Sequence, residues 1–441
     1  MRSLRLAIIG LLLGATAPAW ANDVVIHAGH LIDGVNAAPR DNVSILVTND
    51  RITAVQPGFV TPQGAEIIDL SHATVLPGLI DSHTHVTYRR GGFAERLTGN
   101  DMEDALHGTV AVRQLLLGGF TAIRNVGADG GTDLALKHAI ERGDIVGPRM
   151  WVSLEYLGPS GGATDPADGI DSSWHNDHWG ASVIDGPEEA IKQVREHKRR
   201  GADLIKILPS GAVGNPGDAS DPRASMMTEA EIKAVVDTAH SLGMKVAAHA
   251  HGKGAIDMSL RLGVDSIEHG TYGDAESFKL YKEHGAYLVP TVLIPELVAQ
   301  KARDLPPQGG LSPAEKAAKI TGVIRKMFHD AYLAGVKIAF GTDVAGLLPF
   351  DGNAREFAVM VHEGMKPMDA IFAATRNSAD LIGASDRIGS VQAGRYADII
   401  AVSGNPLEDI TELERVKFVM KGGQVYRDDL KVAPHCVACM R

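Results

Sequence analysis

The sequence predicts an α/β protein in which a (β/α)8 TIM-type barrel carries a small β-sandwich domain formed from both chain ends. Three observations support this prediction. The chain has 441 residues, enough for a barrel of roughly 250 residues and a smaller unit. Apolar runs of strand length alternate with helix-like stretches through its middle, and short β-like segments gather at both ends. Such alternation is typical of a parallel sheet, because parallel neighbours need crossover connections.

The middle of the chain supplies eight β/α units. One strand precedes His83, and the others are expected at residues 121–126, 150–157, 204–208, 246–250, 266–269, 287–292 and 338–342. Helices are expected between them, for example at residues 104–117, 188–199, 228–242 and 313–333. Eight such units, with polar residues where the strands end, favour a closed barrel over an open sheet.

The two ends of the chain have a different character. Short β segments are expected at residues 24–27, 43–47, 52–55, 398–402 and 416–420, separated by Gly, Asn and Asp turn residues. The predicted divisions are a signal peptide (1–21), the first part of the β domain (22–77), the barrel (78–384), the second part of the β domain (385–430) and a tail (431–441).

The first residues have the pattern of an export signal. Arg2 and Arg5 are followed by an apolar run over residues 6–17 and by the small-x-small triplet that ends at Ala21. A retained membrane anchor is the alternative, but the run is short for a bilayer span. We therefore expect cleavage after Ala21, a periplasmic or secreted protein, and no membrane association after cleavage.

Charge and cysteine content limit the partners. A formal net charge of −11 disfavours nucleic acids and anionic membrane surfaces. The two cysteines, Cys436 and Cys439, stand in the tail, where a small structural disulfide or an inert pair is expected. A redox role and a tail metal site with His435 are alternatives.

Two motifs give the first indication of chemistry. His83 and His85 follow an apolar strand in PGLIDSHTH, and alternate residues of a strand share one face. Lys206 stands inside the apolar strand LIKIL, where a charged amine is costly to bury. It is either an ordinary lysine that reaches solvent or a carboxylate, or a neutral amine that captures carbon dioxide. The resulting carbamate would be an anionic ligand able to bridge two metals.

Three further strand ends carry polar residues of the same kind. They are His249 and His251 in AAHAHG, His269 in SIEHG, and Asp343 in FGTD. Each alone has an ordinary explanation as a satisfied polar group. Together they offer nitrogen and oxygen ligands of the types that zinc prefers, at the barrel face where active sites lie.

These motifs in combination resemble the amidohydrolase superfamily. The tail segment GSVQAGRYADIIAVSGNPLEDI is similar to that superfamily's return into its small β domain, and the resemblance extends from about residue 27 to residue 426. The branch that it resembles contains imidazolonepropionase, Xaa-Pro dipeptidases, related carboxypeptidases and ochratoxinases. Lys206 makes the sequence more similar to the two-metal, peptidase-like members of this branch. Imidazolonepropionase is of the one-metal type and lacks the bridging lysine.

The resemblance implies a role for each residue. His83, His85 and Asp343 would hold the first of two divalent metal ions, expected to be zinc. Lys206, as a carbamate made with carbon dioxide, would bridge to the second ion, which His249 and His269 complete. His251 would contact the substrate, although its role and that of His249 could be exchanged. Asp343 would also move the proton, as general base and then acid.

The expected function is hydrolysis of the amide bond of N-acyl amino acids or dipeptides with an apolar C-terminal residue, by metal-activated water. The partner would be this small molecule, and the protein a homo-oligomer. One alternative is hydrolysis or deamination of a cyclic amide or heterocycle. Another is noncatalytic metal-dependent binding, for which Asp343 would not be needed.

One loop and one departure also bear on the substrate. Residues 158–186 form a long loop containing Trp174, His175, His178 and Trp179, which we expect to be a lid or an oligomer contact. Related enzymes often have a histidine after a Gly-Gly pair here, but Ala163 follows Gly161 and Gly162. If that histidine orients the substrate carboxylate in the related enzymes, the resemblance implies that this chain binds its substrate differently or less well.

Overall fold

The structure is a computed structural model that describes residues 23–88, 100–162, 165, 167, 171, 173, 183–213, 221–301 and 313–431. The expected signal peptide, Ala163, the Trp and His residues of the 158–186 loop, and both cysteines lie outside the described residues. No helix in the described part of the chain has the length and apolarity that a membrane span requires.

Eight strands of the described chain run parallel to their neighbours in two sheets, ordered β5-β6-β7 and β12-β11-β10-β9-β8. The strands are β5 (Leu79–Thr84), β6 (Phe120–Asn125), β7 (Arg149–Val152), β8 (Leu204–Ile207), β9 (Lys245–Ala250), β10 (Ser266–His269), β11 (Tyr287–Val289) and β12 (Lys337–Ile338). Each lies where the sequence predicted a strand, although β7, β11 and β12 are shorter than expected.

Backbone hydrogen bonds join the two sheets at both junctions. The N–H of Leu157, beyond β7, donates to the Lys206 carbonyl at 2.8 Å. At the other junction the Ser82 N–H donates to Phe340 at 2.8 Å, and the Asp343 N–H donates to His83 at 2.9 Å. The pairing thus shows an α/β arrangement of parallel strands, but it does not show one continuous barrel sheet.

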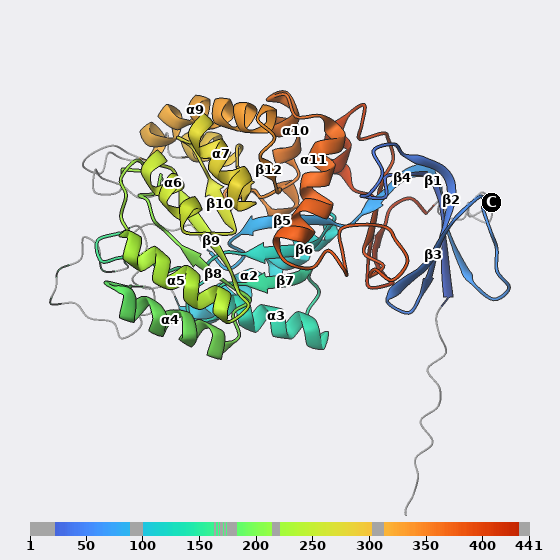
Figure 1. Cartoon of the computed structure of the whole chain (residues 1–441). Helices are drawn as coiled ribbons and strands as arrows, with labels where there is room; N and C mark the ends of the chain where they lie inside the picture. Colours follow the sequence, from blue (N-terminus) through green and yellow to red (C-terminus); the bar gives the residue numbers. More distant parts are fainter. Residues whose placement is uncertain are drawn as a thin grey trace, which may run out of the picture.

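Helices follow the strands and surround them (Figure 1). They are α2 (Asp101–Leu117), α3 (Thr132–Arg142), α4 (Pro187–Arg200), α5 (Glu229–Ser241), α6 (Lys253–Arg261), α7 (Ala275–His284), α8 (Ile294–Lys301), α9 (Pro313–Leu333), α10 (Arg355–His362), α11 (Pro367–Phe372) and α12 (Ser378–Leu381). Two of the predicted helices begin at capping side chains. Asn100 accepts the Glu103 N–H ahead of α2, and Thr228 forms a capping box with Glu231 ahead of α5.

The chain ends form one seven-stranded sheet, ordered β15-β14-β13-β4-β1-β2-β3, beside the helix-bearing unit (Figure 1). Its strands are β1 (Asp23–Leu31), β2 (Arg40–Thr48), β3 (Arg51–Pro57), β4 (Glu66–Pro77), β13 (Ile399–Val402), β14 (Phe418–Lys421) and β15 (Gln424–Asp428). The prediction that both ends build a β unit is confirmed at the level of strand pairing. A second, facing sheet of the expected sandwich is not shown, because the long β4 pairs with β1 and then with β13, which joins both ends into one sheet.

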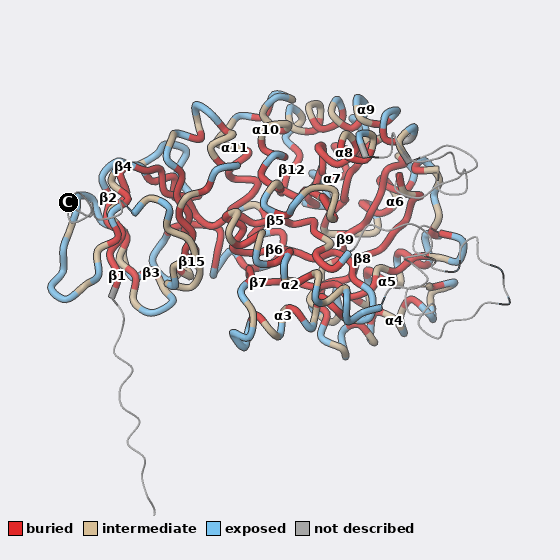
Figure 2. Tube along the Cα trace, turned by 180° about the vertical axis from the view of Figure 1, so that it is seen from behind, coloured by how far each residue is buried: buried red, intermediate tan, exposed pale blue. Residues whose placement is uncertain are grey.

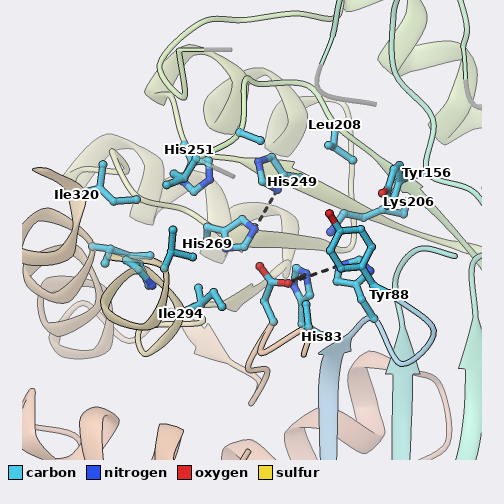
Figure 3. A pocket seen from close by; sticks show the side chains of 18 residues that line it. His83, Tyr88, Tyr156, Lys206, Leu208, His249, His251, His269, Ile294 and Ile320 are labelled. Carbon is cyan, nitrogen blue, oxygen red and sulfur yellow. Dashed lines mark hydrogen bonds and ion pairs between the residues drawn. The ribbon is translucent and has the colours of Figure 1, made fainter. Parts of the chain in front are cut away.

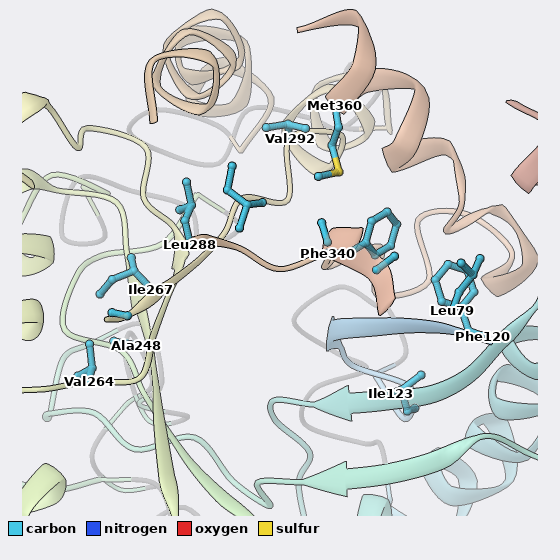
Figure 4. Packing of buried hydrophobic residues seen from close by; sticks show 14 of the residues in the cluster. Leu79, Phe120, Ile123, Ala248, Val264, Ile267, Leu288, Val292, Phe340 and Met360 are labelled. Carbon is cyan, nitrogen blue, oxygen red and sulfur yellow. The ribbon is translucent and has the colours of Figure 1, made fainter. Parts of the chain in front are cut away.

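The main core lies between the parallel strands and their helices, and the buried trace follows the strands through the molecule (Figure 2). Leu79 and Phe120 from the first strands belong to the same buried cluster as Phe340, Val292 and Met360 (Figure 4). Burying such side chains stabilises each by about 1.5–3 kcal/mol. This packing holds the strands in place, and it therefore fixes the positions of the polar side chains at their carboxyl ends.

Candidate metal centre

All seven residues predicted from the strand ends line one pocket of the described chain (Figure 3). They are His83, His85, Lys206, His249, His251, His269 and Asp343. They lie on or directly after four strands, β5, β8, β9 and β10, and on the segment after β12. The structure therefore brings together the whole set that the sequence proposed.

Asp343 stands next to both histidines of the first motif. Its Oδ1 lies 3.7 Å from His83 Nε2 and 3.6 Å from His85 Nε2. Gly341 makes this approach possible, because a Cβ there would lie 2.8 Å from the Cβ of His83. Asp343 itself has a φ of 53°, in a region that non-glycine residues rarely adopt and that is found at functional sites.

The other three histidines form a second group that adjoins the first. His249 Nδ1 and His269 Nε2 lie 3.0 Å apart, and the rings of His251 and His269 stack with centroids 4.7 Å apart. Nitrogen atoms of His249, His251 and His269 lie within 4.8 Å of one another. So do ligand atoms of His83, His269 and Asp343, so His269 belongs to both groups.

A hydrogen bond to one nitrogen orients each ring. His83 Nδ1 donates to Glu268 at 2.8 Å, and His85 Nδ1 donates to the Gly127 carbonyl at 3.1 Å. His269 Nδ1 is bonded to Thr291 Oγ1 at 2.7 Å, His251 Nδ1 to Thr271 Oγ1 at 2.7 Å, and His249 Nε2 to the Gly211 carbonyl at 3.3 Å. Such bonds fix the tautomer and direct the opposite nitrogen toward a metal. His249 is thus directed through Nδ1, and the other four through Nε2.

Glu268 is a functional residue that the sequence analysis did not single out. This buried carboxylate of β10 accepts from His83, and it also accepts from Arg124 Nη2 at 2.7 Å and Ser266 Oγ at 2.6 Å. Arg124, on β6, balances its charge and also donates to the Ser82 carbonyl at 2.6 Å. Arg124 and Glu268 could have been noticed in the sequence, because each is a charged residue inside an apolar strand.

Burial favours the neutral form of the imidazoles, which metal binding requires. Burial lowers the pKa of His83, His249 and His269 well below the ordinary value, and it lowers the pKa of His251 to about 3. Burial also lowers the pKa of Lys206 to about 8, against the opposing effect of the Glu268 and Asp343 carboxylates. Neutral imidazoles and a carboxylate match the ligand types of zinc, so the donor set fits a metal centre.

The pocket has two unlike walls on either side of this centre (Figure 3). On one side α8 and α9 contribute aliphatic side chains, namely Ile294, Pro295, Val298, Ile320 and Ile324. On the other side Tyr88 and Tyr156 carry phenol groups, and the Tyr156 ring meets His85 edge-on at 6.2 Å. The sequence analysis predicted neither wall.

Comparison with known proteins agrees with the geometry. Residues 74–426 match the amidohydrolase family. The chain belongs to this family.

Individual members share most of its length. Ochratoxinase from Aspergillus niger is 32% identical over 435 residues, which cover 92% of this chain and 87% of that protein. The crystal structure of a Xaa-Pro dipeptidase with methionine bound in its active site is 36% identical, with a TM-score of 0.85 over 92% of this chain and all of that one. A prolidase structure in complex with N-methylphosphonate-L-proline is 30% identical, with a TM-score of 0.83 and the same coverage.

Family membership confirms the resemblance inferred from the motifs and identifies the chain as a hydrolase of amide bonds. The pocket of this family member contains histidine groups suited to a metal ion.

Proposed function

We propose that this chain is a two-metal hydrolase that cleaves the amide bond of N-acyl amino acids or dipeptides with an apolar C-terminal residue. The observation that carries the proposal is one pocket in which histidine, lysine and aspartate side chains from five segments of the chain adjoin a wall of aliphatic side chains. A closed barrel, in which strand ends converge on one mouth, would explain that convergence.

The donor set divides between two ions. His83, His85 and Asp343 would hold one, and His249 and His269 the other. Lys206 is buried within the same pocket, and as a carbamate it would supply two oxygens that bridge the ions. When bound, two metals of this kind lower the pKa of water toward ~7 and polarise a carbonyl group.

Asp343 is the group we assign to proton transfer. Its carboxylate has two oxygens, so one can bind metal while the other accepts the proton of the attacking water. The same oxygen then returns the proton to the departing amine. Its side chain is 20% exposed, which leaves it accessible to a substrate that enters the pocket.

The walls indicate how a substrate would lie. The aliphatic wall suits an apolar side chain, and the Tyr88 and Tyr156 phenols can donate hydrogen bonds to carbonyl or carboxylate oxygens. We assign His251, which lies near the aliphatic wall in Figure 3, to contact with the substrate. A dipeptidase and an ochratoxinase among the relatives support amides of amino acids as the class to test.

The test is a substrate panel with purified, zinc-loaded enzyme. N-acetyl-L-phenylalanine, N-acetyl-L-leucine and the dipeptides Met-Pro and Ala-Phe are compared with N-acetylglycine and N-acetyl-L-aspartate. We expect kcat/KM about tenfold or more higher for apolar residues, because each buried methylene contributes discrimination. Asp343→Asn is the inactive control.

Two outcomes would oppose the proposal. Equal turnover of N-acetylglycine and N-acetyl-L-phenylalanine would show that the aliphatic wall does not select apolar substrates. If the enzyme turned over cyclic amides such as hydantoin but no open-chain amide, its function would instead be the hydrolysis or deamination of cyclic substrates.

A further inference from the structure

The short segment of residues 290–293, between β11 and α8, touches both halves of the pocket. Thr291 is fully buried, and its Oγ1 is bonded to His269 Nδ1 at 2.7 Å. Ile294, directly after the segment, belongs to the aliphatic wall. The position of these four residues therefore sets the orientation of a metal-ligand ring and the place of an apolar contact.

This segment has a backbone conformation that its own residues do not favour. Thr291 has a φ of 48°, in the left-handed region, where a β-branched residue is a rare outlier. Such conformations persist when surrounding contacts determine them. The segment thus needs a contact that holds its backbone in place.

Glu356, on α10, provides that contact. Its Oε1 accepts the Val292 N–H at 2.7 Å and its Oε2 accepts the Leu293 N–H at 2.9 Å. The Glu356 side chain is fully buried. Its chain neighbour Phe357 belongs to the same hydrophobic cluster as Val292 and Met360, which are labelled in Figure 4. Burying a carboxylate costs free energy unless hydrogen bonds offset its desolvation. Here the two successive backbone N–H groups provide that offset.

A second link joins the same elements. Arg325 of α9 donates to Glu296 of α8 at 2.7 Å, and its Nε lies 3.9 Å from Glu363, which follows α10. The two helices of the aliphatic wall are therefore connected to each other and to the end of α10. Glu356 contacts the segment directly before α8.

We propose that Glu356 is a positioning residue that clamps residues 290–293 and so sets both the His269 ring and the aliphatic wall. It touches neither metal nor substrate, and it acts through Thr291 on one side and Ile294 on the other. The effect on selectivity rests on the proposed hydrolysis and the effect on zinc affinity rests on the proposed metal centre, whereas the effect on the backbone rests on neither.

The test is Glu356→Gln, which keeps the shape of the side chain but replaces one acceptor oxygen by an NH2 group. Glu231→Gln is the matched control, because Glu231 is also buried and accepts a backbone N–H, from Thr228 at 2.8 Å, but does so on α5. Amide hydrogen exchange at Val292 and Leu293 should become about tenfold faster or more in Glu356→Gln, since one N–H loses its acceptor. The control should leave it unchanged.

Zinc affinity, measured by competition with a chromogenic chelator, is the second readout. It should fall about tenfold in Glu356→Gln, as expected when a partner that orients a ligand histidine is disturbed. The ratio of kcat/KM for N-acetyl-L-phenylalanine over N-acetylglycine should fall as well. Unchanged exchange at both amides, or unchanged zinc affinity, would overturn the proposal.

A second variant keeps the test decisive if Glu356→Gln does not fold. Thr291→Val removes only the hydroxyl that meets His269, and it should weaken zinc binding while leaving exchange at Val292 and Leu293 unaltered. Zinc affinity equal to that of the wild type would then refute the link between this segment and the metal ligand. If the wild type hydrolyses no amide of the panel, the proposed function fails, and exchange and zinc affinity still decide on the clamp.

Discussion

His249 and His251 leave the same strand two residues apart, yet hydrogen bonds fix their rings in different ways. The His249 ring is held through Nε2 by Gly211, and the His251 ring through Nδ1 by Thr271. His249 therefore directs Nδ1 toward His269 Nε2, at 3.0 Å. This pair of nitrogens supports the assignment of His249 as the ligand, which the family resemblance implied.

The two histidines should separate by metal content. We expect His249→Ala to lose one metal ion per chain, because only the His269 nitrogen of the pair would remain to hold that ion. His251→Ala should keep its metal and mainly raise KM. Elemental analysis together with both kinetic constants distinguishes the variants. Metal loss in His251→Ala alone would exchange the two assignments.

Lys206 has the burial that the carbamate proposal requires. It is 2% exposed on β8, and no ordinary salt bridge to it is found among the described residues. Lys206→Ala should lower turnover by at least about 10², because it removes a bridging ligand from both ions. Short carboxylic acids such as propionate should restore part of the activity by supplying the missing oxygens.

Lys245→Ala is the matched control for this prediction. Lys245 stands at the start of β9, away from the strand end, and donates to the Asp380 carbonyl at 3.2 Å. Its loss should leave metal content and turnover as they are. Normal metal content and turnover in Lys206→Ala would show that Lys206 is an ordinary buried lysine.

At the scale of single elements, local patterns predicted where strands and helices lie. Apolar runs located the strands, and α9 (Pro313–Leu333) coincides with the expected residues. Strand lengths were less predictable, since pairing decides them. The expected strand at residues 338–342 pairs as a strand over only Lys337 and Ile338. Beyond them, the Phe340 carbonyl and the Asp343 N–H are bonded to the backbone of β5.

Partners distant in the sequence account for what was missed at the site. His83 and Glu268 are 185 residues apart, and only the fold brings their side chains into contact. The motifs could therefore predict the residues that end the strands, but not those that orient them. The aliphatic wall was missed for a similar reason, because α8 and α9 have ordinary apolar faces until their place above the pocket is known.

Helix α3 offers a test of burial at the scale of an element. Asp133, in its first turn, is fully buried and accepts N–H bonds from Leu134 at 2.8 Å and Leu154 at 3.2 Å. Burial raises the pKa of this carboxyl from 3.8 to about 7. Since the folded value lies above the unfolded one, stability is fully present below the unfolded pKa and is lost as pH rises through about 7.

Asp133→Asn should remove this pH dependence. Its free energy of unfolding relative to wild type should rise between about pH 4 and pH 7, by at most about 1.4 kcal/mol per pH unit. Urea unfolding of chelator-treated protein measures it, which keeps metal binding out of the comparison. Asp144→Asn, beyond the exposed end of the same helix, is the control. Parallel pH curves for wild type and Asp133→Asn would contradict the account.

At the scale of the whole molecule, the site depends on segments from across the chain. Pocket residues run from His83 on β5 to Ala345 after β12. Hydrogen bonds from the Ser82 N–H to Phe340 and from the Asp343 N–H to His83 hold those two segments together. The sequence predicted this convergence from the eight β/α units. It did not predict the single seven-stranded sheet, because the pairing of β4 with β13 joins residues more than three hundred positions apart.

The central claim is that these residues hold two metal ions, and metal stoichiometry tests it most directly. Protein stripped with a chelator and titrated with zinc should bind about two ions per chain, as a two-metal hydrolase requires. Amide hydrolysis should be absent from the stripped protein and complete only after the second ion. Saturation at one ion, or hydrolysis that persists without metal, would contradict the account.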